Sequence, residues 1–219
     1  MKRIITILLV LISNYAFSQQ AKPAFWQDIQ QFRHLDSVQP PPAHPILFVG
    51  SSSFTKWTDV QNYFPGYTIL NRGFGGSTLN DLLRYEEDVI FKYDPKQIVI
   101  YCGENDIASS DTVTDAIAFD RFKKLYAEIR AVYPDVPVVY ISMKPTPSRW
   151  HLKNKMMQSN KLIENYLKKE KNAQFVNVWN AMLASGGKPK ADIFIADNLH
   201  MNAKGYAIWQ KILQPYLLK

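Results

Sequence analysis

Five short apolar runs alternate along this sequence with longer segments in which apolar residues recur every three or four positions. The short runs predict buried strands, and the longer segments predict helices packed against them. Parallel strands need helical crossovers, so the alternation predicts one three-layer α/β/α domain with a five-stranded parallel sheet. The expected strands are residues 45–50, 68–70, 97–101, 136–143 and 175–179, and the expected helices are residues 54–63, 78–92, 112–132, 152–170 and 203–217.

A further helix is expected before the first strand, over residues 23–36, where Phe25, Ile29 and Phe32 recur at helical spacing. Three consecutive prolines at 40–42 then favour an extended connector. We therefore divide the chain into an N-terminal helix and proline-rich connector over residues 19–44 and the main domain over residues 45–219.

The first 18 residues have the pattern of a secretory signal peptide. Lys2 and Arg3 precede an uncharged apolar run over residues 4–12, and small residues follow, with Ser18 at the expected cut. A membrane anchor is the alternative, but a span needs about 20 apolar residues and this run is less than half that long. The pattern predicts cleavage after Ser18, a secreted or periplasmic protein and no stable membrane insertion.

Charge and cysteine content narrow the possible partners. The formal net charge of +7 falls to +5 once Lys2 and Arg3 are removed, and the basic residues are scattered. Scattered charge does not favour nucleic-acid binding. Cys102 is the only cysteine, so no internal disulfide can form. The 201 residues after the cut must therefore be stabilised by one apolar core.

The carboxyl ends of strands in such a sheet are where chemistry is usually placed. Ser52 follows the first expected strand and enters a helix, where free backbone N–H groups favour developing negative charge. A plain helix N-cap is the alternative for a lone serine.

Two further strand ends carry groups that suit an oxyanion. The loop 71–77 contains Gly76, whose backbone N–H can approach a ligand closely. A dinucleotide loop is disfavoured there because the Gly-x-Gly-x-x-Gly spacing is not met; a structural turn stays open. After the third strand, Asn105 can donate its amide to an oxyanion or hold a turn.

One histidine stands apart from the other three. His200 has a carboxylate, Asp197, three residues before it, close enough to orient the imidazole ring. A serine needs such an oriented base to become nucleophilic at neutral pH. A metal site is the rival interpretation, but the sequence contains neither His-x-x-His nor Cys-x-x-Cys, so we expect no metal.

These blocks, in this order, resemble the SGNH/GDSL hydrolases: Gly50-x-Ser52, the 71–77 loop with Gly76, Gly103-Glu104-Asn105-Asp106, and Asp197-x-x-His200. The resemblance covers residue 46 to the C-terminus. It implies a flavodoxin-like sheet of order 2-1-3-4-5, GDSL-like lipase or acylhydrolase chemistry of the serine esterase type, and no cofactor.

The resemblance also implies a role for each residue. Ser52 would be the nucleophile, His200 the general base and Asp197 its orienting partner. The oxyanion hole would comprise the backbone N–H groups of Ser52 and Gly76 and the side chain of Asn105. The usual aspartate of Gly-Asp-Ser is Ser51 here, so Ser51 and Ser53 stay open as alternative nucleophiles.

Short connections between the blocks leave little room for a large lid or a long acyl tunnel. Trp57, Arg149 and Trp150 are candidates to line an open cleft, with core packing the alternative for each tryptophan. We expect a secreted esterase of short acyl esters, above all O-acetyl groups on carbohydrate. A lysophospholipase, lipase or thioesterase on the same scaffold is an alternative, and a catalytically silent glycan-binding module is another. The oligomeric state stays open.

Overall fold

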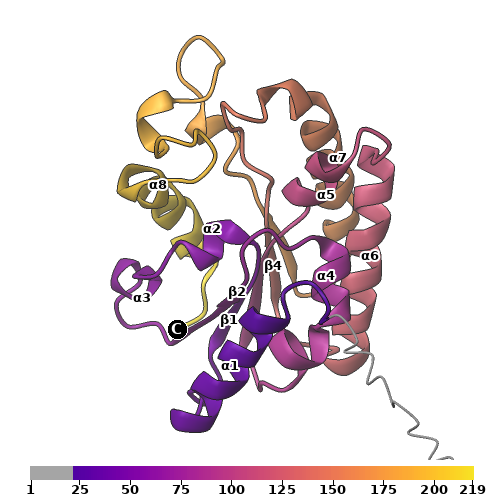
Figure 1. The fold of residues 1–219 in the computed structure, drawn as a ribbon, viewed down its shortest axis with the longest axis vertical. Coiled ribbons are helices and arrows are strands. Elements are labelled where there is room, and N and C mark those ends of the chain that lie inside the picture. Colours follow the sequence, from indigo (N-terminus) through magenta and orange to yellow (C-terminus); the bar gives the residue numbers. More distant parts are fainter. Residues whose placement is uncertain (1–21) are drawn as a thin grey trace, which may run out of the picture.

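The computed structural model describes residues 22–219, which form a sheet of five parallel strands with helices on both faces (Figure 1). The strand order is β2-β1-β3-β4-β5, which confirms the expected α/β/α architecture. The predicted signal peptide and its cut site lie outside the described residues. The strands are β1 (Ile46–Gly50), β2 (Ile69–Gly73), β3 (Gln97–Tyr101), β4 (Val138–Ile141) and β5 (Ala173–Val176).

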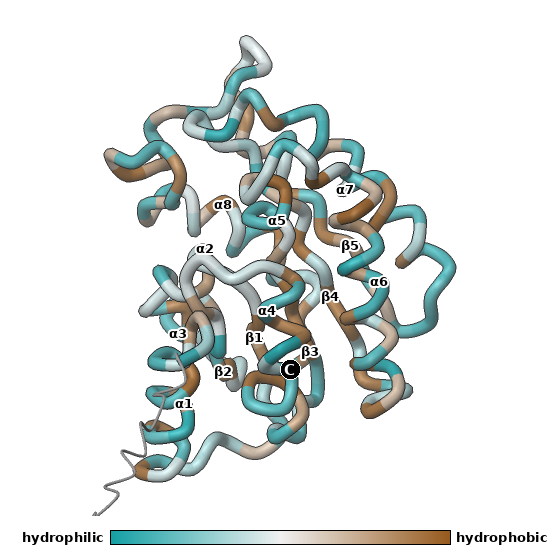
Figure 2. Tube along the Cα trace, turned by 45° about the vertical axis from the view of Figure 1, so that its right-hand side comes forward, coloured by the Kyte–Doolittle hydropathy of each residue, from teal (hydrophilic) through white to brown (hydrophobic). Residues whose placement is uncertain are grey.

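The three strands β2, β1 and β3 end level with one another. Gly50, the last residue of β1, pairs with Gly73 of β2 and with Tyr101 of β3. Every residue of β1 and β3 is buried, as expected of strands covered on both faces. Figure 2 shows the same distribution, with apolar residues gathered along the central strands. The segments that follow these strands therefore begin at one common edge of the sheet.

The helices divide between two apolar clusters, one on each face of the sheet. One face is covered by α1, α4, α6 and α7, and the other by α2, α3 and α8 (Figure 1). The short helix α5 starts at the carboxyl edge of β3 and adds Ile107 to the first cluster. The bounds are α1 (Trp26–Val38), α2 (Ser52–Thr55), α3 (Val60–Tyr63), α4 (Leu79–Arg84), α5 (Glu104–Ser109), α6 (Asp115–Val132), α7 (Lys153–Leu167) and α8 (Ala203–Leu213).

Most of the expected elements differ from the observed ones at their ends, and three of the differences have a local cause. The helix expected over residues 54–63 is two short helices, α2 and α3, because the intervening Trp57 is fully buried in the core. The expected helix 78–92 ends as α4 at Arg84 and is followed by a π-helical turn, Glu87–Phe91. The last strand ends at Val176, because Oδ1 of Asn177 accepts the N–H of Trp179 and turns the chain.

The N-terminal helix is fixed to the main body by buried charge. Asp36 of α1 accepts hydrogen bonds from Arg72 at the end of β2 and, at 2.8 Å, from Oη of Tyr93. Nζ of Lys92 lies 2.6 Å from the same carboxylate. Burial acts to raise the pKa of Asp36, but these partners outweigh it and lower the pKa. None of the helices within residues 22–219 is both long and apolar enough to cross a bilayer.

Candidate active site

Gly50 shapes the turn between β1 and the serine run. Its φ is +148°, and a Cβ at this position would lie 2.0 Å from the backbone oxygen of Tyr101. No residue with a side chain can approach β3 this closely. Ser51 follows, with its N–H donating to the same oxygen at 3.0 Å, and Ser52 opens α2. The turn therefore directs Ser52 to the carboxyl edge of the sheet.

Three side chains meet in a line at this edge. Nε2 of His200 lies 2.9 Å from Oγ of Ser52, and Nδ1 of His200 lies 2.6 Å from Oδ2 of Asp197. The other carboxylate oxygen, Oδ1, accepts the backbone N–H groups of Leu199 and His200, both at 2.9 Å. A hydroxyl, an imidazole and a carboxylate in this sequence form the arrangement that makes a serine nucleophilic.

Asp197 is ionised over the whole working range of an enzyme. Desolvation acts to raise its pKa, but the hydrogen bonds from the His200 ring and from the backbone of His200 and Leu199 outweigh it. The pKa of Asp197 is lowered to about 2. A permanently charged carboxylate holds the ring orientation and stabilises an imidazolium when one forms.

The two neighbouring serines are placed differently from Ser52. Ser51 and Ser53 are 3% and 1% exposed, whereas Ser52 is half-buried. Neither hydroxyl contacts His200, whose ring nitrogens meet only Ser52 and Asp197 among the described residues. The structure thus places Ser52, and not Ser51 or Ser53, beside the imidazole.

The glycine loop after β2 lies against Ser52. A Cβ built on Gly75 would be 3.9 Å from Cβ of Ser52, and both Gly75 and Gly76 are exposed. Gly76 has a φ of +88°. The backbone N–H groups of Ser52 and Gly76 donate to no acceptor within residues 22–219. Two donors are therefore unused in the part of the chain that meets Ser52.

Asn105 joins this group from α5. Its Nδ2 donates to the backbone oxygen of Ser77 at 2.9 Å, while Oγ of Ser77 donates to the oxygen of Gly50 at 3.1 Å. The amide carries a second N–H, which has no partner within the described residues. The loops after β1, β2 and β3 are thus hydrogen-bonded together around Ser52.

Asp106 is a positioning residue that reasoning from the sequence missed, although it stands in the block that contains Asn105. Its carboxylate is fully buried and accepts the N–H of Leu79 at 2.9 Å and Nη1 of Arg121 at 2.8 Å. Burial raises the pKa of Asp106 despite Arg121. Because Leu79 opens α4 and Arg121 lies on α6, Asp106 ties α5 to both helices and so fixes Asn105.

A buried charge cluster behind the site was also missed. Oη of Tyr101 and Nζ of Lys144 both donate to Oε2 of Glu104, the lysine at 2.8 Å. Nη1 of Arg149 lies 3.1 Å from Oε1 of the same carboxylate. Burial acts to raise the pKa of Glu104, but Lys144 and Arg149 outweigh it and lower the pKa. The sequence showed only that Lys144 follows the predicted strand 136–143; in the structure it is buried, and lysine is almost never fully buried unless paired.

The expectation that Trp57 lines a cleft is wrong. Its side chain is fully buried and stacks on Tyr206 with ring centroids 4.7 Å apart. The indole serves the core between α2 and α8. Arg149 and Trp150 do lie at the carboxyl edge, after β4, and Trp150 stacks on Trp179 at 6.2 Å and 25°. They are partly exposed.

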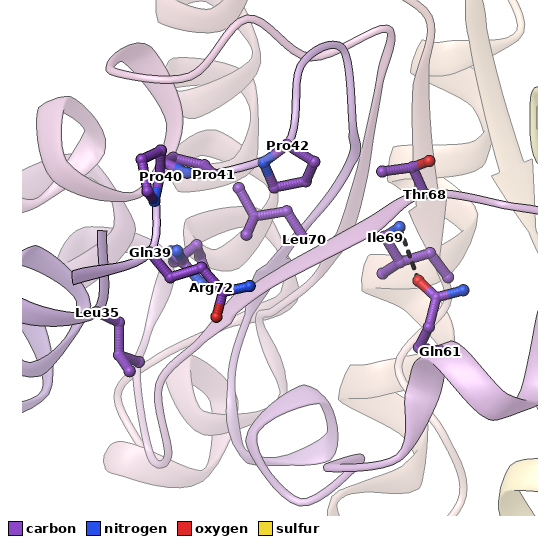
Figure 3. A pocket seen from close by; sticks show the side chains of 10 residues that line it. All are labelled: Leu35, Gln39, Pro40, Pro41, Pro42, Gln61, Thr68, Ile69, Leu70 and Arg72. Atoms are coloured by element: carbon purple, nitrogen blue, oxygen red, sulfur yellow. Dashed lines mark hydrogen bonds between the residues drawn. The ribbon is translucent and has the colours of Figure 1, made fainter. Parts of the chain in front are cut away.

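The pocket in Figure 3 is separate from this constellation. It has a volume of about 440 Å³ and lies where the end of α1 and the proline connector meet the edge strand β2. Gln61 closes one side by accepting the N–H of Ile69 at 3.1 Å. None of its lining residues belongs to the serine–histidine group. No cluster of three potential metal-ligating side chains occurs within residues 22–219.

Residues 47–208 match the sequence model of the GDSL-like Lipase/Acylhydrolase family. No curated protein sequence matches the chain. Among solved structures, a Streptococcus pneumonia protein described as a platelet activating factor has a TM-score of 0.76 at 22% identity, covering 88% of this chain and 92% of that one.

Two other solved structures are similar in fold. A GDSL-like lipase from Bacteroides thetaiotaomicron has a TM-score of 0.70 at 23% identity, covering 86% of this chain and 96% of that one. An acetylxylan esterase from Geobacillus stearothermophilus has a TM-score of 0.63 at 15% identity, covering 82% and 97%. At these identities the likeness shows a common fold.

Proposed function

The chain belongs to the GDSL-like lipase/acylhydrolase family, and from this premise we propose that it is a serine esterase that removes short acyl groups, above all O-acetyl groups on carbohydrate. The proposal rests on the line of Ser52, His200 and Asp197. Nε2 of His200 lies 2.9 Å from Oγ of Ser52, and Nδ1 of His200 lies 2.6 Å from Oδ2 of Asp197. The proposal makes this line the catalytic centre.

The first half of the reaction is acylation of Ser52. Oγ attacks the ester carbonyl carbon while Nε2 of His200 takes the hydroxyl proton, and the Nδ1–H of the resulting imidazolium stays hydrogen-bonded to the carboxylate of Asp197. The carbonyl π electrons move onto oxygen, giving a tetrahedral oxyanion. The backbone N–H groups of Ser52 and Gly76 and the free N–H of Asn105 donate to this oxygen. Each donor of this kind contributes about 2.7–4 kcal/mol to the barrier reduction.

The second half returns the serine. His200 gives its proton to the leaving alcohol as the C–O bond breaks, which leaves the acyl group on Oγ. Water then attacks the acyl-enzyme while His200 takes a proton from it, and the oxyanion forms again on the same donors. Collapse releases a carboxylic acid and restores the Ser52 hydroxyl, with no further reactant required.

Preference for a short acyl group is supported by the surroundings of Ser52. Gly75, whose added Cβ would lie 3.9 Å from Cβ of Ser52, carries no side chain, so this loop adds no apolar group where it meets Ser52. Acetyl groups on carbohydrate are further supported by likeness in fold to an acetylxylan esterase. We also propose that residues 1–18 are removed on export, which N-terminal sequencing of exported protein tests.

The test is a series of p-nitrophenyl esters from acetyl to palmitoyl, followed by acetylated glycans, each with wild type and Ser52→Ala. We expect fastest turnover on acetyl and propionyl esters, none by Ser52→Ala, and no effect of dialysis against EDTA. A rate that rises toward long chains would assign a lipase or lysophospholipase instead. Glycan binding without hydrolysis of any ester would overturn the enzyme proposal and assign a binding module.

A further inference from the structure

Two ammonium groups lie over the indole of Trp150 at the carboxyl edge of the sheet. Nζ of Lys153 lies 4.9 Å from the ring centroid and Nζ of Lys188 lies 5.6 Å from it, while Arg149 is the neighbouring residue. These three residues come from the loop after β4, the start of α7 and the segment before α8. In Figure 1 these segments lie beyond the same end of the sheet. We call Arg149, Lys153 and Lys188 the cationic rim.

The cationic rim borders the proposed catalytic centre on two sides. The N–H of Ser148 donates at 3.1 Å to the oxygen of Asn198, which lies between Asp197 and His200 in the chain. On the other side, the guanidinium of Arg149 reaches Glu104, the residue before Asn105. The Arg149 end of the rim is thus attached both to the loop that holds the histidine, through the neighbouring Ser148, and to the helix that holds the amide donor, through Glu104.

The rim carries more positive charge than its surroundings neutralise. Glu104 is the single acidic partner, and Lys144 already pairs with it at 2.8 Å. Within the described part of the chain, Lys153 and Lys188 form no ion pair. The Arg149 side chain is 20% exposed, and apart from Nη1, which faces Oε1 of Glu104, its guanidinium nitrogens meet no acceptor in residues 22–219. Unused, partly desolvated guanidinium donors bind carboxylate or phosphate oxygens in pairs.

We propose that the cationic rim is an anion subsite that binds a carboxylate or phosphate carried by the alcohol part of the acyl ester. The inference rests on the proposed function, because the side of the substrate follows from the mechanism. His200 protonates the leaving alcohol, so the alcohol lies toward the Asp197–His200 loop, and that loop is the one joined to Ser148. The acyl group lies on the side of Gly75 and Gly76.

The test compares matched esters that differ by one anionic group. One pair is acetylated methyl glucuronoside and acetylated methyl glucoside; the other is acetylated glycerol 3-phosphate and acetylated glycerol. We expect kcat/KM to be about tenfold higher for the anionic member, mainly through KM, and the advantage to shrink as salt is raised. A larger advantage in the first pair identifies an acidic sugar, and a larger one in the second identifies a phosphate group.

Variants of the cationic rim show which side chains cause the higher kcat/KM for the anionic esters. Arg149→Gln and the double variant Lys153→Gln/Lys188→Gln should each reduce the anionic advantage toward one, and Arg149→Lys should reduce it less than Arg149→Gln. Lys211→Gln, on the exposed side of α8, removes the same charge elsewhere and should keep the advantage. Should Arg149→Gln fail to fold, the double variant still decides, since the side chains of Lys153 and Lys188 make no hydrogen bond or ion pair within the described residues.

Equal kcat/KM for the members of both pairs, or an advantage that survives in Arg149→Gln and in the double variant, would overturn the subsite. Failure of the esterase proposal is a separate result, seen as no hydrolysis of p-nitrophenyl acetate by wild type. In that case calorimetric titration of Ser52→Ala with the acetylated glucuronoside and glucoside still tests the rim. Tighter binding of the glucuronoside supports it, and equal binding excludes it.

Discussion

Oγ of Ser52 and Nε2 of His200 lie 2.9 Å apart although 148 positions separate them in the chain. Ser52 opens α2, and His200 precedes α8. The two helices are packed together by Trp209, whose ring lies 6.4 Å from that of Phe54, and by Tyr206, whose Oη donates to the oxygen of Ser53 at 2.9 Å. Packing of α8 on α2 therefore sets the distance between hydroxyl and imidazole.

Ser52→Ala should lower kcat by about 10⁶-fold, because no other hydroxyl contacts His200. Steady-state kinetics on p-nitrophenyl acetate measures the loss, and circular dichroism checks the fold. Ser51→Ala and Ser53→Ala are the matched controls and should stay active. Comparable loss in either control with an active Ser52→Ala would place the nucleophile elsewhere in the run.

His200→Ala should lose as much activity as Ser52→Ala, and the double variant should be hardly worse than either. Two residues that act as one unit give strongly non-additive losses. The measurement is kcat/KM for all three variants. His151→Ala serves as control, since His151 is exposed and lies after β4; equal damage from it would show that the base is wrongly assigned.

Asn105→Ala should lower kcat by roughly 10²–10³-fold with little change in KM, because the free N–H is used mainly after charge develops on oxygen. The separate values of kcat and KM on one acetyl ester give the result. A variant that raised KM alone would show that Asn105 binds the ground state and is not part of the oxyanion hole.

Asp197→Asn should reduce the esterase activity and, near neutral pH, the free energy of unfolding. Activity should fall by about 10³–10⁴-fold as the ring loses its oriented tautomer. The pKa of Asp197 is lowered from 3.8 to about 2 in the folded state. Its contribution to stability is therefore present above about pH 4 and is lost as pH falls through about 2.

The size of that stability effect is limited by solvent, since the Asp197 side chain is 42% exposed. Screening keeps it to about 1 kcal/mol or less. Urea unfolding at several pH values should show wild type more stable than Asp197→Asn near neutral pH, with the two converging near pH 2. A constant difference at all pH values would contradict the assignment.

Lys144→Met should destabilise the fold by about 3–5 kcal/mol, because it leaves the carboxylate of Glu104 buried with a weaker partner. Glu104→Gln combined with Lys144→Met removes both charges and should cost less than Lys144→Met alone. Urea unfolding of wild type, both single variants and the double variant completes the cycle. A double variant that is the least stable of the four would show that the two side chains do not act as a pair.

The layers and the carboxyl-edge position of the candidate residues were predictable because both depend on short-range patterns. The strand predicted over residues 97–101 is observed as β3 with those bounds, since the short apolar run Ile98–Tyr101 is read directly from the sequence. The catalytic roles of the candidate residues at the carboxyl edge stay predictions. The strand order came from family resemblance and is confirmed.

What the sequence could not show depends on contacts between distant segments. Trp57 has the same residue type whether it lies in a cleft or in the core, and its burial depends on packing against Phe48 of β1 and against Tyr206 and Trp209 of α8. Lys144 and Glu104 are 40 positions apart, and nothing local marks them as partners. Helix α5 spans six residues, too few for a periodic signal.

The separation of Ser52 and His200 by 148 positions in the sequence also determines when activity can first arise as the protein folds. The sheet contains only parallel pairings, which are non-local and form slowly, and the imidazole meets Ser52 only when α8 is docked on α2. The rate of ester hydrolysis during refolding therefore reports the docking of α8 on α2, whereas far-ultraviolet circular dichroism reports the formation of helices. Variants that loosen Trp209 should accordingly delay the recovery of turnover after refolding without delaying the recovery of helix signal.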